Sequence, residues 1–583
     1  HADRVVSLTQ PVADAFLDKI GKDKIDPAYI ANFGEEVVRG SPSFVLSGLL
    51  RAIDAKAREA AGAGSWEIVA APPAASSSAD GAIVGVIRSL GSLAEIAGDD
   101  LSKTPTVVVA AAVGGNEDIP LGVVAVLTSS VADALSHVAL RARAQGVLLA
   151  TCFDEQALAA LAGSEGKRAA LKVSAAGEVT AALAENDSKA SSSSAAAASS
   201  SSTTKASLEL PKPAKTKEWV LSEEEYSAKG APVGGKAANL ATLRTKLSKT
   251  TSSSSSSPSI RIPNSVALPH GTFERLLAEP VNAALAKDVA KWQAEADKAA
   301  TSAALPLPAE ALAALRGAVR RRLRPTPEVS SALAAKATAA GLIPSASVWE
   351  FSKSDCSDAS PELRRTWKAI SAVFASKWTD RAWLARRAAG VVGGDSSLFM
   401  GVLVQEVVPA AYAFVLHTSD PTAKAEEVEE GTVYGEVVVG AGDALVGAAP
   451  GRAAAFRSSS EKNGKGGVTT LALPSKRLGW FVADPAAPGL IARSDSNGED
   501  LGAFSGAGLH DSVTLSPLAT RTLDYSGERI VFDAGFREEV FAKLGEVGRA
   551  VKEAMGGEED QDVEGVVAAD GSVSCVQARP QIV

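Results

Sequence analysis

His137 is the side chain best placed to carry a transferable group, and the chain has five histidines in all. It follows a β-branched segment and a polar loop, near the start of a segment predicted to be helical. An imidazole is a good nucleophile near neutral pH and a good leaving group once phosphorylated. Backbone N–H groups at a helix start would stabilise a phosphoryl group, and Arg141 and Arg143 would add positive charge. The alternative interpretation, which position alone favours, is a buried structural histidine.

A glycine-rich turn, Val233-Gly234-Gly235-Lys236, precedes a second predicted helix. Glycines before a helix allow backbone amides to approach phosphate oxygens, and a lysine adds a positive charge. The turn is not a P-loop, which needs a serine or threonine directly after the lysine. On its own, Gly-Gly-Lys before a helix is more often only a turn.

The most specific motif of the chain begins as Arg493-Ser494-Asp495-Ser496-Asn497-Gly498-Glu499-Asp500 and extends to Val513. An arginine at a strand end can hold phosphate oxygens with two parallel hydrogen bonds. The glycine-rich continuation, which contains Gly506 and Gly508, can then cover the phosphates. A solvated acidic loop is the alternative interpretation.

A hairpin near the C-terminus carries two oxygen-bearing side chains, Glu564 and Gln577, on adjacent predicted strands. A turn at Asp570-Gly571 joins the strands, so the two side chains can point the same way. Mg²⁺ accompanies ATP phosphates, takes oxygen ligands and keeps several waters. As bare residues, however, one glutamate and one glutamine carry no metal signal.

Two low-complexity segments divide the chain. A Ser/Ala-rich stretch within a linker predicted over 184–215 is typical of flexible tethers, in which about 30 residues span roughly 30 Å. The polyserine tract 250–259 is predicted to be a surface-loop insertion. The predicted fold class is multidomain α/β, with a helical segment over 1–65, a β/α domain over 66–183 and, after the linker, a larger mixed domain over 216–583.

Hydrophobic periodicity predicts the elements that must position the candidate residues. In the 66–183 domain, the predicted strands are 106–112, 123–127 and 147–150, and the predicted helix is 132–144. In the 216–583 domain, the predicted helices are 235–247, 309–323, 362–387 and 537–555. The predicted strands there are 401–408, 413–418, 433–439, 563–569 and 573–577.

Composition narrows the classes of partner. The 583 residues carry a formal net charge of −9, which argues against a nucleic acid as the main partner. No run of about 20 apolar residues occurs, so no membrane span is expected. The three cysteines have no zinc or disulfide spacing and fit a reducing compartment. Because the chain begins at His1 without an initiator methionine, we expect a fragment from which any targeting peptide has been removed.

Two stretches, Glu35–Pro42 and Glu117–Asp154, resemble the phosphohistidine domain of α-glucan water dikinases. The segments around Lys236, Arg493 and the C-terminal hairpin resemble the ATP-binding domain that these enzymes share with pyruvate phosphate dikinase and phosphoenolpyruvate synthase. The resemblance covers nearly the whole chain outside the serine tracts. It implies a swivelling β/α phosphohistidine domain linked to a nucleotide-binding domain of the ATP-grasp kind.

The same resemblance implies roles for the candidate residues. His137 would be the phosphohistidine carrier, with Arg141 and Arg143 beside it. The implied nucleotide-binding residues are Lys236, Gln405, Arg493, Ser494, Gly506, Gly508 and Arg579, and the implied Mg²⁺ ligands are Glu564 and Gln577. Asp443 stands where relatives usually have glutamate, so it is not assigned.

The implied reaction is ATP + α-glucan + H₂O → AMP + phosphoglucan + phosphate. The β-phosphate would pass through His137 to the carbon-6 hydroxyl of a glucosyl residue, and the γ-phosphate would go to water. The implied cofactors are Mg²⁺ and ATP, and the implied partner is starch or another α-glucan in the plastid stroma or on the starch granule. Two alternatives stay open: a related dikinase that uses a phosphoglucan or a small-molecule acceptor, and a non-catalytic glucan-associated scaffold. The presence of all the site residues argues against the scaffold, and a homodimer also stays open.

One departure from the family concerns a thiol pair. Plant members often have Cys-x-x-x-Cys just after the carrier histidine, a pair that can form a regulatory disulfide. In this chain the first position is Leu148 and only the second is a cysteine, Cys152. One thiol cannot make the bridge, so redox control by this route is in doubt and Cys152 is expected to be a small buried hydrophobe.

Overall fold

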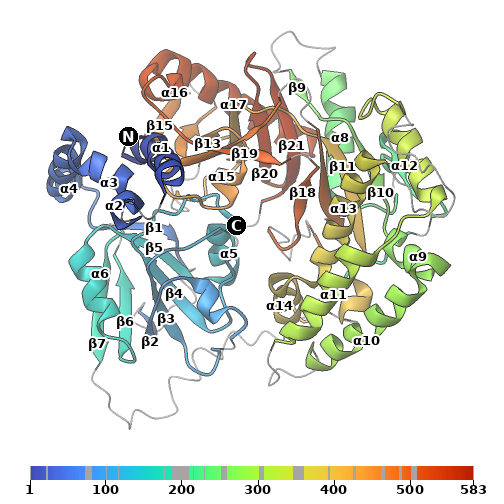
Figure 1. Cartoon of the computed structure of the whole chain (residues 1–583), viewed down its shortest axis with the longest axis horizontal. Coiled ribbons are helices and arrows are strands. Elements are labelled where there is room, and N and C mark those ends of the chain that lie inside the picture. The colour runs from blue at the N-terminus through green and yellow to red at the C-terminus, as the bar shows by residue number, and fades with distance from the viewer. Residues whose placement is uncertain are drawn as a thin grey trace.

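The computed structural model contains a helical arm near the N-terminus, an N-terminal α/β unit (residues 66–184) and a larger C-terminal unit (residues 209–581) (Figure 1). The structure describes residues 2–21, 24–25, 27–72, 82–99, 101–115, 117–174, 177–184, 209–214, 216–228, 230–250, 259–300, 307–345, 360–391, 394–423, 429–460, 467–484, 489–499, 508–515 and 517–581. Most of the predicted linker, nearly all of the polyserine tract and Gly506 therefore lie outside the described residues.

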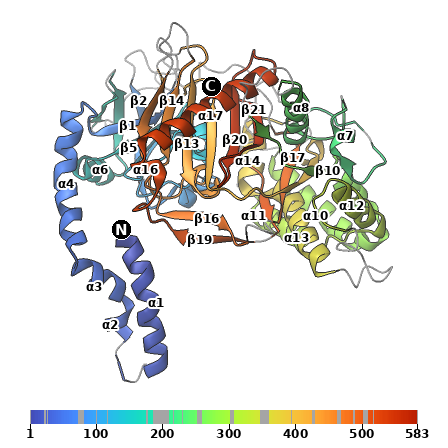
Figure 2. The same ribbon diagram turned by 90° about the horizontal axis from the view of Figure 1, so that it is seen from above.

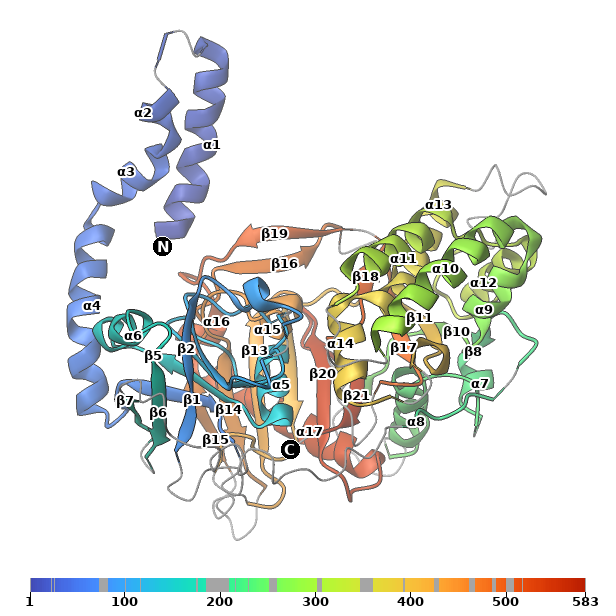
Figure 3. The same ribbon diagram turned by 90° about the horizontal axis from the view of Figure 1, so that it is seen from below.

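The N-terminal arm consists of α1 (Ala2–Ile20), α2 (Pro27–Ala31), α3 (Phe33–Arg39) and α4 (Pro42–Ala60). It projects away from the rest of the chain (Figures 2 and 3). Helices α1 and α3 pack closely, and a Cβ atom added at Gly34 would lie 3.1 Å from the Cα atom of Val6. Within the described part of the chain, no helix combines the length and the apolar character that crossing a membrane requires.

The N-terminal α/β unit is built on one sheet with the strand order β1-β5-β4-β3-β2-β6-β7. Strands β2 to β5 run parallel, whereas β1, β6 and β7 are antiparallel to their neighbours. The bounds are β1 Trp66–Ala70, β2 Ile83–Leu90, β3 Thr106–Ala110, β4 Val123–Thr128, β5 Leu148–Cys152, β6 Arg168–Val173 and β7 Val179–Ala184. Helix α5 (His137–Gln145) packs on one face and α6 (Glu155–Ala162) on the other. Since α5 follows β4, its first residue lies at the carboxyl edge of the parallel strands, where α/β proteins commonly bind ligands.

The predicted helix over 132–144 starts too early. Helix α5 begins at His137, and the preceding residues form a loop. The backbone N–H groups of Ala134 and Leu135 donate to the carboxylate of Glu436 in the C-terminal unit. In a helix that began at residue 132, the N–H of Leu135 would instead donate to the carbonyl four residues earlier. A partner about 300 residues away therefore sets the start of the helix.

The C-terminal unit contains a five-stranded sheet, sheet B, with the antiparallel order β18-β17-β11-β10-β8. Its strands are β8 Leu221–Ser222, β10 Ser265–Leu268, β11 Met400–Glu406, β17 Leu490–Ser496 and β18 Ser512–Thr514. A core of helical side chains covers it. The helices beside it are α9 Thr272–Ala278, α10 Ala283–Ala300, α11 Ala309–Arg322, α12 Pro327–Ala339, α13 Pro361–Ala375 and α14 Asp380–Ala388.

The second large sheet of this unit, sheet C, has the order β15-β14-β13-β12-β20-β21-β9. Its strands are β9 Ile260–Arg261, β12 Tyr412–His417, β13 Val433–Val439, β14 Ala454–Ser458, β15 Val468–Ala472, β20 Gln561–Val567 and β21 Val573–Pro580. Helices α8 (Gly235–Thr250) and α17 (Ala534–Ala554) pack on one face. The remaining elements are α7 Glu223–Tyr226, α15 Asp443–Val446, α16 Arg529–Phe532 and a two-stranded ribbon of β16 Leu478–Val482 and β19 Leu518–Thr522.

Side-chain alternation gives sheet C two different faces. Phe414 and Leu416 of β12 belong to the core under α8 and α17, whereas Val415 belongs to a cluster that includes Leu135 of the N-terminal unit. The same alternation places Glu436 and Glu564, the two partners of Val415, on the face that the N-terminal unit covers. Polar chemistry on sheet C thus faces the other unit.

The single helix predicted over 362–387 is wrong, because it is interrupted in the structure. Helix α13 ends at Ala375, a 3-10 turn covers Ser376–Trp378, and α14 starts at Asp380. Thr379 begins the second helix, since its hydroxyl accepts a hydrogen bond from the N–H of Ala382. The interruption turns Arg381 toward the carbonyl of Leu509, so a helix-shaped pattern is broken by contacts made far along the chain.

Candidate active site

A cavity of about 770 Å³ lies between the two units and collects most of the candidate residues. The N-terminal unit contributes His137, from the first turn of α5. The C-terminal unit contributes side chains from sheet B, sheet C and the start of α8. The predicted residues on the cavity wall are His137, Lys236, Gln405, Arg493, Ser494, Gly508, Glu564, Gln577 and Arg579. Arg141 and Arg143 are not on the wall, and Gly506 lies outside the described residues.

The imidazole of His137 is packed against the C-terminal unit. Its Nδ1 atom is buried and has no hydrogen-bond partner among the described residues. A Cβ atom added at Gly508 would lie 2.6 Å from that Nδ1 atom. Burial lowers the pKa of His137 well below its ordinary value, and the nearby charges of Arg141, Arg579, Arg381 and Lys236 lower it further. The ring is therefore neutral at physiological pH, which is the state a nucleophile needs.

Arg141 and Arg143 lie on α5 after His137, and neither lines the cavity. Arg141 lies one turn after His137 and donates to the carbonyls of His137 (3.2 Å) and Gly115 (2.5 Å), and it pairs with Asp118 (3.2 Å). Arg143 points to another side of α5. It donates to the carbonyls of Ala134 (2.7 Å) and Val69 (2.9 Å). Protein acceptors thus already engage both guanidinium groups.

The turn before α8 is held by an acidic side chain of the 493–500 motif. The Asp495 carboxylate accepts hydrogen bonds from the N–H groups of Gly234 (2.7 Å) and Ala237 (3.2 Å). A Cβ atom at Gly234 would lie 2.6 Å from the Oδ1 atom of Asp495, so glycine is needed for this close approach. Burial raises the pKa of Asp495 to about 6, although the hydrogen bonds and Lys236 oppose the shift.

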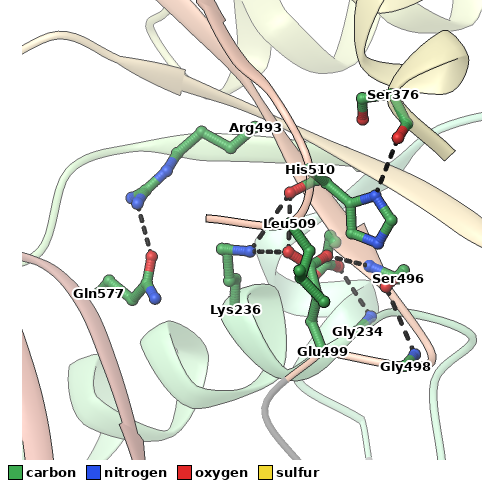
Figure 4. A network of polar contacts seen from close by, with 12 residues as sticks. Gly234, Lys236, Ser376, Arg493, Ser496, Gly498, Glu499, Leu509, His510 and Gln577 are labelled. Carbon is green, nitrogen blue, oxygen red and sulfur yellow. Dashed lines mark hydrogen bonds and ion pairs between the residues drawn. The ribbon is translucent and has the colours of Figure 1, made fainter. Parts of the chain in front are cut away.

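Lys236 points into the same motif (Figure 4). Its ammonium lies 2.5 Å from the Glu499 carboxylate and 3.4 Å from the hydroxyl of Ser494, which itself donates to Glu499 at 2.8 Å. Burial opposes ionisation of Glu499, but Lys236 and His510 overcome it and lower the pKa of that carboxyl to about 2. The first turn of α8 is therefore joined to β17 by a buried ion pair at the edge of the cavity.

Arg493 bridges the two sheets of the C-terminal unit. From β17 of sheet B it donates to the side-chain oxygen of Gln577 (2.6 Å) and to the carbonyl of Val576 (2.6 Å) on β21 of sheet C. It also lies 3.7 Å from the Glu564 carboxylate and 3.4 Å from the side-chain oxygen of Gln405. The amide nitrogen of Gln405 is buried and has no partner among the described residues, so it remains free to bind a ligand oxygen.

Arg579 is held in place by Asp562. Its guanidinium donates twice to one carboxylate oxygen of Asp562, at 2.9 and 2.7 Å, and both side chains are buried. The arginine lines the cavity and contributes to the lowered pKa of His137. Asp562 thus holds the guanidinium of Arg579 at a position where its positive charge acts on the imidazole of His137.

Glu564 and Gln577 are direct cross-strand partners in the C-terminal hairpin. The backbone register brings the two oxygen-bearing side chains together, next to Arg493. Such a pair leaves room for the waters and phosphate oxygens that usually complete the shell of Mg²⁺. In the described part of the chain, no group of three or more His, Cys, Asp or Glu side chains is arranged to hold a metal ion.

Several residues on or beside the cavity were not predicted to be site residues. Arg381 lines the wall and is oriented by Asp511 (2.6 Å). Asp443 lies near Glu564, and burial followed by that charge raises its pKa. His510 lies near Glu499, and burial lowers its pKa to about 4. In the sequence, the signal that could have identified these residues as site residues was their position inside longer motifs that resemble the family.

Cys152 is a buried free thiol at the end of β5, and its Sγ atom lies 3.3 Å from the carbonyl of Asp154. Burial raises its pKa, which makes the reactive thiolate scarce. This environment is that of a small core residue.

Comparison with known proteins identifies two domain families in the chain. The model of the α-glucan water dikinase phosphohistidine-like domain matches residues 75–190, and the model of the pyruvate phosphate dikinase AMP/ATP-binding domain matches residues 231–461. The first match contains His137 and the second contains Lys236 and Gln405. No solved structure matches the chain significantly.

Curated relatives are similar along nearly the whole chain. The chloroplastic α-glucan water dikinase of Solanum tuberosum is 34% identical over 576 residues, which are 99% of this chain and 35% of that protein. The chloroplastic α-glucan water dikinase 1 of Arabidopsis thaliana is 32% identical over 591 residues, 100% of this chain and 37% of that protein. The α-glucan water dikinase 2 of the same plant is 33% identical over 570 residues. The chain thus spans little more than a third of the length of these relatives.

Proposed function

We propose that the chain catalyses an α-glucan, water dikinase reaction. Its similarity to α-glucan water dikinases along nearly its whole length supports this proposal, and so do its matches to a phosphohistidine-like domain and an AMP/ATP-binding domain. In this proposal the β-phosphate of ATP passes to His137 and then to the carbon-6 hydroxyl of a glucosyl residue. AMP and phosphate are the other products. The chloroplastic α-glucan water dikinases among the relatives support a plastid location and an α-glucan, which we propose is starch-like, as the acceptor.

One observation carries the proposal most strongly. His137 belongs to the N-terminal unit, yet its imidazole lies on the wall of a cavity whose other side chains belong to the C-terminal unit. Those side chains include Lys236, Arg493 and Arg579, which carry the positive charge that polyphosphate binding needs. A nucleophile from one unit thus faces a phosphate-type site on the other.

We infer that the Nε2 atom of His137 attacks the β-phosphorus. The packing of Gly508 against Nδ1 leaves Nε2 as the ring nitrogen that can approach a phosphate. A new P–N bond forms while the bond between the β-phosphorus and the oxygen that bridges the α- and β-phosphates breaks. AMP leaves with that oxygen, and the β- and γ-phosphates stay on the ring. Water then takes the γ-phosphoryl group, and the phosphoryl group on nitrogen goes to a glucosyl hydroxyl. The lowered pKa of His137 keeps its lone pair available for the first step.

Charged side chains around the cavity would hold the phosphates in line. Lys236, Arg493 and Arg579 are each fixed by a buried acceptor, so they are oriented before a ligand arrives. Gln405 offers an unsatisfied amide nitrogen. We infer that Glu564 and Gln577 hold Mg²⁺, which would neutralise charge on the phosphates when bound.

We propose that sheets B and C form an ATP-grasp-like nucleotide-binding domain. The cavity lies where β11 and β17 of sheet B face β20 and β21 of sheet C, and Arg493 joins the two sheets across it. This arrangement supports a nucleotide held between two sheets. We also propose the domain boundaries 66–183 and 216–583, and the containment of each sheet within one unit supports them.

The proposed cycle requires the two units to separate. An imidazole packed against Gly508 cannot reach a polysaccharide, so the N-terminal unit must leave the cavity after phosphorylation. A single carrier then serves a nucleotide site and an acceptor site in turn. A homodimer stays a prediction, and light scattering of the purified protein would test it.

The experiment that tests the proposal is incubation of the purified chain with Mg²⁺ and ATP labelled at the β-phosphate, beside a His137→Ala variant. The expected result is acid-labile, base-stable label on the wild type alone, followed by transfer of the label to added α-glucan. Folded wild-type protein that takes up no label would refute phosphohistidine catalysis by this chain and would favour a non-catalytic scaffold. Label that moves only to a phosphoglucan or to a small molecule would favour a related dikinase.

A further inference from the structure

The loop before the carrier helix is gripped by a carboxylate of the other unit. The N–H groups of Ala134 and Leu135 donate to the two oxygens of Glu436, at 2.8 and 3.0 Å. Glu436 is 2% exposed and receives a further hydrogen bond from the hydroxyl of Tyr434 at 3.0 Å. The two gripped amides lie three and two residues before His137, so little chain separates the grip from the imidazole.

A second buried carboxylate makes the reciprocal contact. Asp133 of the N-terminal unit accepts a hydrogen bond from the N–H of Ala453 at 2.8 Å and forms an ion pair with Lys476. The ammonium of Lys476 is fully buried and also donates to the carbonyl of Ala449 at 2.5 Å. Each unit therefore contributes one buried carboxylate that accepts hydrogen bonds from donors of the other unit.

The side chains between these polar contacts are apolar and belong to a core shared by both units. Ala134 and Leu135 pack with Ala413 and Val415 of β12 and with Leu445 of α15. Burying a carboxylate is costly unless its oxygens are hydrogen-bonded. Glu436 obtains two of its donors only when the other unit is docked, so its burial and the docking of the loop depend on each other.

Glu436 also has a fixed relation to the phosphate side of the cavity. It is the cross-strand partner of Val415 on β12, and Val415 is in turn the partner of Glu564 on β20. Two strand spacings place the Cα atoms of Glu436 and Glu564 about 10 Å apart on one face of sheet C. Glu436, which binds the loop before His137, and Glu564, which is proposed to bind the metal, thus lie in line across three neighbouring strands of one sheet.

We propose that Glu436 and the Asp133–Lys476 pair form a docking latch that positions His137 for phosphoryl uptake from the nucleotide and is not needed for phosphoryl delivery to the acceptor. This inference rests on the proposed function. Glu436 is a positioning residue, because it acts on the imidazole through the backbone of the carrier loop. Loss of the latch should slow uptake and leave nucleotide binding unchanged.

Two variants with matched controls separate the latch from general damage. In Glu436→Gln the side-chain nitrogen faces a backbone N–H, so at least one hydrogen bond is lost. In Gly115→Ala the new Cβ would lie 2.7 Å from the Cα atom of Gly447 in the other unit, which blocks docking. The controls are Glu538→Gln, an exposed carboxylate on α17, and Gly114→Ala, whose Cβ would meet only Glu117 at an ordinary 3.5 Å.

The measurements are the rate of label uptake from β-labelled ATP, the affinity for ATP by calorimetry, and the rate at which protein loaded by long incubation passes its label to glucan. We expect uptake to fall at least about tenfold in both latch variants, because a buried hydrogen bond to the loop is lost in one and docking is blocked in the other. Affinity and delivery should stay within about twofold of the control variants. Equal uptake in latch and control variants would overturn the proposal, and so would a parallel loss of affinity and delivery.

A charge reversal at the rim of the interface provides a rescue test. Glu67 of β1 and Arg452 of the C-terminal unit form a two-pronged ion pair, and each side chain is about a third exposed (33% and 31%). Glu67→Arg alone places two arginines together and should slow uptake, whereas the double variant Glu67→Arg, Arg452→Glu should recover at least half of the loss. Failure of the double variant to recover would argue against docking as the cause.

Amide hydrogen exchange tests the docking contact independently of phosphoryl transfer. In the wild type, the amides of Ala134 and Leu135 should be protected, and both latch variants should exchange at least about tenfold faster there than the controls. If the wild type takes up no label but shows this pattern, the proposed function fails, and the latch loses its role in uptake although the docking contact is real. If it takes up label and these amides exchange equally in all variants, the latch fails alone.

Discussion

The Nδ1 atom of His137 lies so close to Gly508 that a Cβ atom on the glycine would be 2.6 Å away. Gly508 has a φ of +65°, a backbone conformation that residues with a side chain rarely adopt. Glycine is therefore favoured here both by its backbone conformation and by the lack of space for a Cβ atom. The imidazole belongs to one unit and the glycine to the other. Their contact defines the docked arrangement of His137 at the proposed nucleotide site.

Gly508→Ala should therefore impair phosphoryl uptake. The added methyl group would push the imidazole out of the cavity, and we expect initial label uptake to fall at least about tenfold. The ATP affinity of the same variant separates this contact with the ring from the nucleotide-binding role that the sequence predicts for Gly508. Stopped-time labelling beside calorimetry checks this, and uptake equal to that of the wild type would show that the ring does not need this position.

Replacement of Glu564 should raise the requirement for Mg²⁺. Glu564→Gln keeps the shape but removes the charge that a hard cation prefers, so we expect the half-saturating Mg²⁺ concentration for labelling to rise at least about tenfold. The control is Glu559→Gln, an exposed carboxylate just before β20. An unchanged Mg²⁺ titration in Glu564→Gln would contradict its proposed role as a ligand.

The buried pair of Lys236 and Glu499 should make the C-terminal unit sensitive to acid. The pKa of Glu499 is lowered from 4.5 to about 2, so its contribution to stability is complete above 4.5 and is lost as the pH falls toward about 2. We expect Glu499→Gln to lower the free energy of unfolding at neutral pH by on the order of 3 kcal/mol. Urea denaturation at several pH values, with Glu538→Gln as the control, measures this. A difference that does not shrink in acid would exclude the ion pair as its source.

Phosphoryl uptake should weaken in mild acid. The pKa of docked His137 lies well below its ordinary value of 6.5. Above pH 6.5 the ring is neutral in both states, but as the pH falls below 6.5 the undocked ring gains a proton first, and docking is weakened down to the lowered pKa. Protonation would also remove the nucleophilic lone pair. Initial rates of labelling across this range should decline toward acid. A rate that rises toward acid would show that the charged ring is the docked form.

The sequence alone determined several of the local elements that carry the candidate residues. The strand 433–439 was predicted with the bounds that the structure shows, and the C-terminal hairpin was predicted with Glu564 and Gln577 on neighbouring strands. A two-residue period and a short turn are local properties, so they can be read without knowledge of the fold. The mixed α/β class followed from the same patterns and is confirmed.

The tertiary structure alone decided how those groups are held. Residues 132–135 were predicted to be helical, yet Glu436 captures the amides of Ala134 and Leu135 and delays the helix to His137. Arg141 was expected to supply charge beside His137, and its charge does lower the pKa of that ring, but only the structure shows that the carbonyl of Gly115 and the carboxylate of Asp118 hold its guanidinium. A local pattern reports only how often apolar side chains recur. Which distant carboxylate or carbonyl reaches a given N–H group is settled when the two units pack, because each buried donor must find an acceptor there.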